Sequence, residues 1–285
     1  MNTLRSLGDA VRSLAATPAG SPLPSEARAV VTALLDALER GELRAAERGD
    51  DGEWRAVPWV KQGILLAFRL GQMVDLSPGH GAGDLSFIDK DTMPPRHFTV
   101  ADGIRVVPGG SSVRRGAYLA AGVVCMPPMY VNVGSWVGPG TMIDSHALVG
   151  SCAQIGARVH LSAAAQIGGV LEPINASPVV IEDDVIVGGN CGVYEGTVVR
   201  QGAVLGAGTV LTRGTPVFDL VHQRVYRGSA ETPLVIPADA VVVPGARSVR
   251  GDFAAAEGLS LQTPVIVKYR DDKTDLATAL EAWLR

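Results

Sequence analysis

The chain has 285 residues, of which 47% are hydrophobic but only 5% aromatic, and it contains 34 glycines and 18 prolines. The 19% of charged residues and the formal net charge of −4 argue against a disordered chain and against a basic nucleic-acid binder. No apolar run reaches the roughly 18 residues that span a bilayer, and no apolar secretory segment opens the chain. Three cysteines do not suggest a disulfide framework, so a cytoplasmic protein without a membrane partner is expected.

The first hundred residues have helical periodicity. Apolar residues recur at helical spacing over residues 4–14, 29–38 and 58–70. Pro58 suits the first position of the third helix, because its missing amide hydrogen has no partner there in any case. We therefore predict an N-terminal helical domain over residues 1–105, with Trp54 packing within it.

From about Val113 the pattern changes to a period of six. A small residue generally lies two places before each repeated position, and Gly, Asn, Asp or Ser generally follows it, which predicts a turn there. The repeated positions are all aliphatic residues or cysteine: Val113, Leu119, Cys125, Val131, Val137, Ile143, Val149, Ile155, Leu161 and Ile167, then Ile181, Val187, Val193, Val199, Leu205 and Leu211.

This period predicts a mainly β fold, a parallel hexapeptide solenoid over residues 106–250. Three hexads form one triangular coil, the repeated residues fill its interior, and successive coils stack about 4.8 Å apart. Residues 169–178 interrupt the repeat. Residues 251–285 are expected to form a C-terminal cap, with a strand at 264–268 and an amphipathic helix at 273–284.

Asp144 and Ser162 lie 18 residues apart in the unbroken repeat, so they should stack on one edge of the solenoid. A carboxylate on such a rigid edge can orient or deprotonate an amine. The alternative is that Asp144 simply tolerates the turn. His160 precedes an inward residue and should point outward near Ser162, as a base or as an inert surface histidine.

Arginines and lysines flank the solenoid. Arg105 lies just before it and is either solvated or a guanidinium clamp for carboxylates. Arg247 and Lys268 lie near the far end and could meet phosphates on the same principle.

Small residues in the repeat also bear on cofactor binding. Gly188, Gly206 and Ala207 are first explained by solenoid turns, but small outward residues also leave room for a pantetheine arm. No metal is expected, because the five histidines do not have zinc-ligand spacing.

The cysteines are predicted from their places in the repeat. Cys125 and Cys191 fall at interior positions. Cys152 is expected to point outward, and no base is paired with it to make it a nucleophile.

Several motifs resemble the tetrahydrodipicolinate N-succinyltransferase family of the lysine and diaminopimelate pathway, which is a hexapeptide-repeat acyltransferase family. The resemblance covers nearly the whole chain and goes beyond the generic hexad. The motifs are at residues 54, 59–61, 65–69, 141–144, 150–156, 159–162, 168–173 and 264–268.

The resemblance implies a trimeric, left-handed β-helix that transfers succinyl from succinyl-CoA to the amine of an open-chain amino-oxo-pimelate. The amine attacks the thioester directly, in a groove between two subunits. The substrate-binding arginine and aspartate of the family correspond to Arg105 and Asp144, and Ser162 and Glu172 in the matching motifs are further candidates.

One segment departs from the family pattern. Many members carry Gly-Ala-Arg-Ser-Glu-Val-Val-Glu-Gly where this chain has residues 188–196. Gly192 replaces the first glutamate, Asn190 replaces the arginine, and Glu195 matches the second glutamate. Asp144, helped by Glu195 or His160, is therefore expected to act as the base.

Three alternatives remain open. Acetyl-CoA could serve as the donor for the same acceptor or for a related amino acid. A γ-type carbonic anhydrase is disfavoured by the histidine count, and a non-catalytic trimeric scaffold would bind no acyl-CoA.

Overall fold

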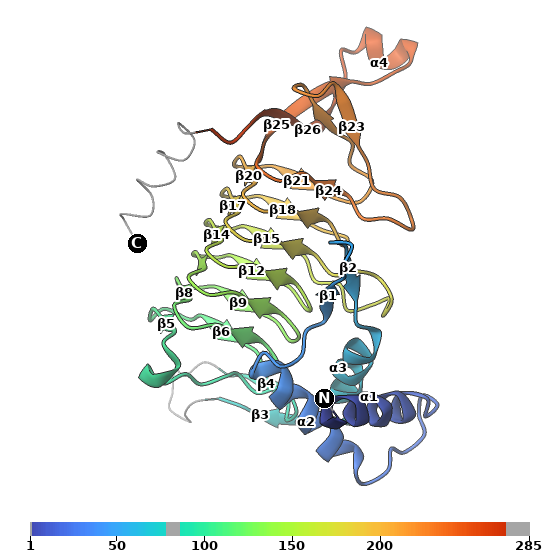
Figure 1. Ribbon diagram of the computed structural model, residues 1–285, viewed down its shortest axis with the longest axis vertical. Helices are drawn as coiled ribbons and strands as arrows, with labels where there is room; N and C mark the ends of the chain where they lie inside the picture. Colours follow the sequence, from blue (N-terminus) through green and yellow to red (C-terminus); the bar gives the residue numbers. More distant parts are fainter. Residues whose placement is uncertain (1, 78–85, 272–285) are drawn as a thin grey trace.

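A computed structural model of the chain describes residues 2–77 and 86–271 (Figure 1). The predicted helical segments are present as three helices. In addition, the described residues of this part form two short antiparallel strand pairs and a 3-10 turn. The elements are α1 (Asn2–Ala15), α2 (Ala27–Glu39), β1 (Ala46–Arg48), β2 (Trp54–Ala56), α3 (Pro58–Leu70), β3 (Met73–Asp75), β4 (Ile88–Lys90) and η1 (Val100–Asp102).

The three helices pack together through small and aliphatic side chains. Val11 of α1, Leu34 of α2 and Ile64 of α3 belong to one buried cluster. The cluster also takes in Val133 and Cys152 from the solenoid, so the helices are joined to the column by apolar packing. None of the helices in the described parts of the chain is long and apolar enough to cross a membrane.

Gly63 of α3 allows the close approach of α2. A Cβ at this position would clash with Leu34 Cδ2 and lie 3.3 Å from Val11 Cγ1. We expect Gly63→Ala to lower the free energy of unfolding by about 1–3 kcal/mol, as overpacking does, although alanine favours helix by about 1 kcal/mol. Urea unfolding followed by circular dichroism measures the change.

Gly8 of α1 provides the matched control. A Cβ there would meet Trp59 at 3.4 Å, an ordinary contact, so Gly8→Ala should be neutral or stabilising. Equal stability of the two variants would show that α2 and α3 can accommodate a Cβ at position 63.

Two-residue strands wind in turn through three parallel sheets, as the period of six predicts (Figure 1). Sheet 1 contains β5 (Arg105–Val106), β8 (Val124–Cys125), β11 (Met142–Ile143), β14 (His160–Leu161), β17 (Ile186–Val187) and β20 (Val204–Leu205). Sheet 2 contains β6 (Ser112–Val113), β9 (Tyr130–Val131), β12 (Leu148–Val149), β15 (Gln166–Ile167), β18 (Gly192–Val193) and β21 (Val210–Leu211). Sheet 3 contains β7 (Tyr118–Leu119), β10 (Trp136–Val137), β13 (Gln154–Ile155), β16 (Val180–Ile181), β19 (Val198–Val199) and β24 (Val235–Ile236).

The interior of this column is the predicted aliphatic set. The repeated residues are at most 4% exposed, and the second residue of each strand points inward. The parallel register pairs inward residues of successive coils, for example Ile143 with Leu161. The parallel β-helix is thereby confirmed.

The corners differ in detail from the prediction. The turn was expected at the residue that follows each inward position, but the left-handed backbone conformation occurs three places after it, as at Gly134, His146 and Cys152. The residue directly after the strand is often glycine because the next coil is close. A Cβ on Gly156, for instance, would lie 2.5 Å from the amide nitrogen of Asp183.

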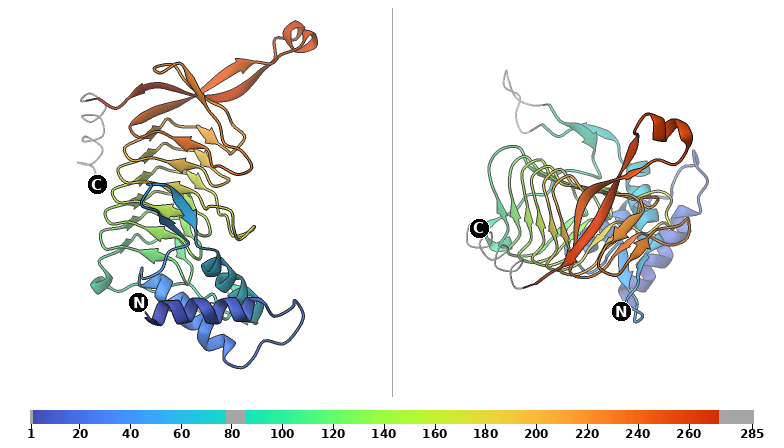
Figure 2. Two further views of the ribbon diagram at one scale, coloured as in Figure 1. Left: turned by 45° about the vertical axis from the view of Figure 1, so that its right-hand side comes forward. Right: turned by 90° about the horizontal axis from the view of Figure 1, so that it is seen from above.

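Further strands, which include two antiparallel pairs, extend sheet 1 at the C-terminal end of the column (Figures 1 and 2). They are β22 (Val217–Asp219), β23 (Arg224–Tyr226), β25 (Ala240–Ser248) and β26 (Ser260–Tyr269), with α4 (Asp252–Ala256) at the tip of the β25–β26 hairpin. The predicted strand at 264–268 lies within β26. The predicted helix at 273–284 lies outside the described residues.

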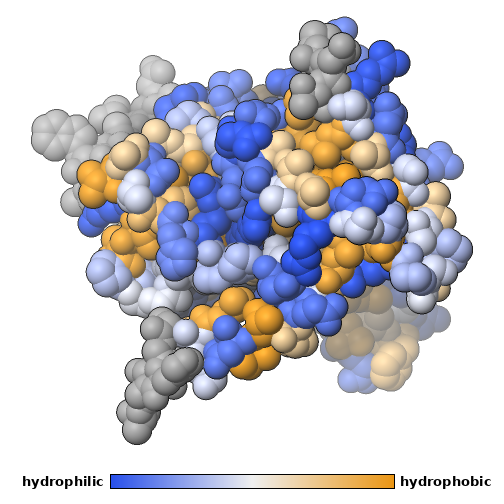
Figure 3. Space-filling model, turned by 90° about the horizontal axis from the view of Figure 1, so that it is seen from below, coloured by the Kyte–Doolittle hydropathy of each residue, from blue (hydrophilic) through white to orange (hydrophobic). Residues whose placement is uncertain are grey.

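The other end of the column carries the N-terminal helices (Figures 1 and 2). Seen from this end, apolar residues gather in separate patches divided by hydrophilic ones (Figure 3). The β1–β2 hairpin rises from the helices along the outside of the column beside sheet 3 (Figure 1). It therefore covers the outside of sheet 3.

Candidate functional site

Asp144 lies where the chain leaves β11 and turns from sheet 1 toward sheet 2. Its amide donates to the Leu161 carbonyl at 2.9 Å, and its Oδ1 accepts the Ser145 amide at 2.7 Å. Its Oδ2 is 3.7 Å from Nε2 of His160, whose side chain is 13% exposed. The structure thus brings a half-buried carboxylate close to an imidazole, and each of these groups can accept a proton.

Further predicted residues continue along the same corner. Ser162, Gly188 and Gly206 each follow a strand of sheet 1, in register with Asp144. Glycine is needed at 188, because a Cβ there would lie 2.6 Å from the Leu205 carbonyl oxygen. The corner therefore presents polar groups at Asp144 and Ser162 and a smooth backbone surface beyond them.

Arg105 shares the outer face of sheet 1 with His160. The register runs from Arg105 through Val124 and Met142 to His160. β5 lies two strand spacings, about 10 Å, from β11, and the Arg105 side chain is exposed. The backbones of these two strands are thus separated by a distance that a small molecule with a carboxylate at one end and an amine at the other can bridge.

Glu195 and Glu172 lie at a different corner of the chain. Both follow strands of sheet 2, and both are exposed. Glu195 accepts the Arg213 amide at 3.1 Å and has a left-handed backbone. Within one chain the structure does not bring them to the Asp144 corner.

Tyr194 covers the position of the family glutamate. Gly192 lies on β18, and a Cβ there would lie 2.8 Å from the Tyr194 hydroxyl. A side chain at position 192 would displace this ring. Tyr194 can therefore take its observed position only because residue 192 is glycine.

The predicted cofactor residues at the C-terminal end do not form one cluster. Arg247 pairs with Leu261 and Lys268 pairs with Val241, at opposite ends of the β25–β26 ladder. Lys268 Nζ is 3.3 Å from Asp271 Oδ1. Ala207 is exposed at the corner beside Gly206.

The three cysteines are reduced and buried. Cys125 and Cys191 lie in the interior, as predicted. Cys152 does point out of the solenoid, but the N-terminal helices cover it, and burial raises the pKa of its thiol to about 12. It is therefore a poor nucleophile. Within residues 2–77 and 86–271, no three His, Cys, Asp or Glu side chains form a metal-binding group.

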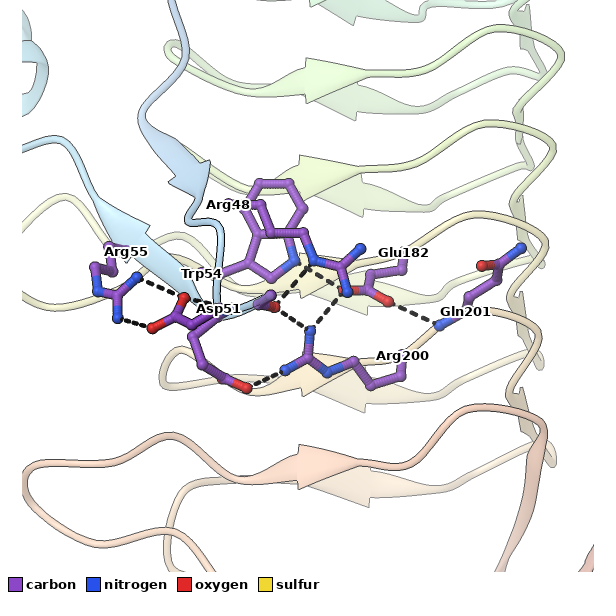
Figure 4. Close-up of polar contacts among 9 residues, drawn as sticks. Arg48, Asp51, Trp54, Arg55, Glu182, Arg200 and Gln201 are labelled. Atoms are coloured by element: carbon purple, nitrogen blue, oxygen red, sulfur yellow. Dashed lines mark hydrogen bonds and ion pairs between the residues drawn. The ribbon is translucent and has the colours of Figure 1, made fainter.

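A polar network that the sequence did not predict ties the β1–β2 hairpin to the column (Figure 4). Glu182 Oε1 accepts the Trp54 indole N–H and a guanidinium N–H of Arg200, both at 2.9 Å, and its Oε2 accepts the Gln201 amide at 3.0 Å. Trp54 thus packs against the solenoid as well as within its own domain. The feature of the sequence that could have indicated this contact is an isolated tryptophan, Trp54, in the otherwise polar segment 50–55.

A second unpredicted cluster lies in the C-terminal strands. Asp219, with a fully buried side chain, accepts hydrogen bonds from the Tyr269 hydroxyl at 2.8 Å and from the His222 amide at 3.0 Å. Burial acts to raise the pKa of Asp219, but these hydrogen bonds outweigh it and lower the pKa to about 2. The cluster locks β22 to β26 and lies on the far strands of sheet 1, remote from Asp144.

Comparison with known proteins gives two family matches. Residues 16–70 match a family described as tetrahydrodipicolinate N-succinyltransferase N-terminal. Residues 178–213 match the hexapeptide repeat of succinyl-transferase.

Similar curated proteins cover almost the whole chain. The 2,3,4,5-tetrahydropyridine-2,6-dicarboxylate N-succinyltransferase of Polynucleobacter asymbioticus is 42% identical over 266 residues, which are 92% of this chain and 91% of that protein. The protein of the same name from Bradyrhizobium diazoefficiens is 41% identical over 265 residues. A solved structure of a putative N-succinyltransferase from Campylobacter jejuni aligns with 86% of this chain and 63% of its own, at 17% identity and a TM-score of 0.47.

Proposed function

Because the chain belongs to the tetrahydrodipicolinate N-succinyltransferase family, we infer that it is an N-succinyltransferase of diaminopimelate and lysine biosynthesis. The observation that carries this inference is 42% identity over 92% of the chain, in an acyl-CoA-using hexapeptide fold. Succinyl-CoA is the proposed donor and L-2-amino-6-oxopimelate the proposed acceptor. The buried, reduced cysteines are consistent with the cytoplasm as its compartment.

The proposed reaction is a direct attack of the acceptor amine on the thioester. The amine nitrogen forms a bond to the carbonyl carbon, the carbon–sulfur bond breaks, and the CoA thiolate leaves. Asp144, or His160 beside it, accepts the proton that the nitrogen loses. Arg105, on the strand two places from that of Asp144, would hold an acceptor carboxylate, and Ser162 would add a hydrogen bond.

A homotrimer with active sites between subunits is part of the proposal. Glu172 and Glu195 lie on a different corner from Asp144, so they can reach the same substrate only from a neighbouring subunit. The outer face of sheet 1 also presents Val124, Met142 and Ile186, which are only half-buried in the single chain. A second copy would cover them.

The donor is tested by a thiol-release assay with L-2-aminopimelate as acceptor. We expect kcat/KM for succinyl-CoA to exceed that for acetyl-CoA by about tenfold or more, because a charged hydrogen bond to the distal carboxylate is worth about 1.5–3 kcal/mol. Light scattering on the same sample reports the trimer.

The alternatives give different results in this assay. A preference for acetyl-CoA would contradict the succinyl assignment and leave the fold untouched. No thiol release with either donor would favour a scaffold.

A further inference from the structure

A cavity of about 340 Å³ separates the β1–β2 hairpin from the outer face of sheet 3. Arg44 and Trp54 line it from the N-terminal part, and Trp136 and Gln154 line it from sheet 3. Small-molecule pockets typically measure about 300–1,000 Å³. Further lining residues, among them Pro139 and Ala157, lie at the corner between sheets 3 and 1, which is not the corner that carries Asp144.

Arg44 is fixed in this cavity by aromatic stacking. Its guanidinium carbon lies 4.0 Å from the Trp136 ring centroid and 5.1 Å from that of Trp54. Its Nε donates to Gln154 Oε1 at 2.8 Å. These contacts hold the plane of the guanidinium and leave its two Nη groups for another partner.

The positive charge of Arg44 has no ion-pair partner among the residues that the structure describes. Burial lowers its pKa to about 10, although the charges of Glu47 and Asp183 partly oppose the shift. A half-buried cation without a close anion has lost part of its hydration, so an anionic ligand would recover part of that cost.

The acidic groups around the cavity limit the charge of such a ligand. Glu182 already accepts hydrogen bonds through both oxygens, and Asp183 Oδ1 accepts the Ala157 amide at 2.9 Å. Both line the cavity, and Arg48 lines it as well, with its guanidinium 3.9 Å from Glu182. The lining thus holds two cationic and two anionic side chains, and a multiply charged anion such as phosphate would leave an excess of negative charge in it. A singly charged, planar group is therefore favoured.

We propose that this cavity binds a small organic molecule with a single carboxylate. The two carboxylate oxygens accept hydrogen bonds from Nη1 and Nη2 of Arg44, in the bidentate geometry that a guanidinium offers. The apolar body of the ligand lies against Trp54, Trp136 and Val180. Binding would also fix the hairpin on sheet 3, and it requires neither acyl-CoA nor the acceptor.

Titration calorimetry of the full-length protein with pentanoate tests the proposal. We expect saturable binding of pentanoate, none of 1-pentanol, and weaker binding of inorganic phosphate. Arg44→Gln should weaken the pentanoate Kd by about tenfold or more, because it removes a charge-assisted pair. Arg55→Gln is the matched control, since Arg55 lies on β2 of the adjoining hairpin but is exposed and paired with Asp51, and it should leave the Kd unchanged.

A second measurement on the unmutated binding site does not depend on how Arg44→Gln folds. In protein labelled with 5-fluorotryptophan, pentanoate should shift the fluorine resonances of Trp54 and Trp136 and leave that of Trp59 in place. The proposal is overturned if Arg44→Gln binds pentanoate as the parent does, if phosphate binds as tightly, or if neither cavity tryptophan responds.

Discussion

Replacing Asp144 with asparagine is expected to lower kcat by about 10²-fold or more, because a positioned general base typically contributes 10²–10⁴-fold. Asparagine keeps the size of the side chain and its hydrogen bond to the Ser145 amide. It cannot accept a proton, so the acceptor amine would lose its hydrogen to water or to His160 alone. Steady-state kinetics with succinyl-CoA and L-2-aminopimelate measure the change.

The split between kcat and KM separates a base from a positioning group. A base affects kcat, whereas a group that only binds the acceptor affects KM. Asp184→Asn is the control, because Asp184 is also a corner aspartate but pairs with Arg158 at 2.6 Å on a different corner. Full turnover by Asp144→Asn would remove Asp144 from the chemistry and leave His160 as the base.

The proximity of Asp144, His160 and Ser162 could be predicted because a parallel solenoid converts sequence spacing into spatial spacing. Residues 18 apart in an unbroken repeat occupy the same place in successive coils. The same rule fails across the interruption at 169–178, where the connection from β15 to β16 is longer than between other successive strands. It also cannot place Glu195 relative to Asp144, because that relation depends on a second subunit and not on the repeat.

The interior of the column was predictable and its corners were not. Aliphatic side chains must fill the triangular interior, and because each side of the triangle takes six residues, they recur with a period of six. Glycine after the strand is typical of a turn. At Gly156 and Gly188, however, it is needed because a Cβ would clash with the backbone of the next coil. Glycine is favoured both where the next coil comes close and where the backbone is left-handed. A single sequence does not distinguish these two causes.

The contacts of the hairpin were missed for a different reason. Trp54 meets Glu182 across 128 residues, and Arg44 meets Gln154 across 110. No local pattern encodes such pairs, because they depend on how the N-terminal part docks on sheet 3. The cavity at Arg44 exists only through that docking, so it could not be inferred from the repeat.

Ile167→Ala is expected to lower the free energy of unfolding by about 2–5 kcal/mol. Ile167 is fully buried, and its strand lies in register between Val149 and Val193. Hydrogen bonds between coils fix their spacing, so the column cannot collapse to fill the cavity, which puts the cost toward the upper part of that range. Urea unfolding at one protein concentration measures this loss, since subunit association also contributes to stability.

The control is Ile88→Ala. This position is 58% exposed, so the substitution should change the free energy of unfolding by less than about 0.5 kcal/mol. A loss below about 1 kcal/mol for Ile167→Ala, well under the usual cost of an isoleucine-to-alanine change in a core, would mean that the coils can relax around a missing side chain, and that the edge bearing Asp144 is less rigid than the catalytic proposal requires.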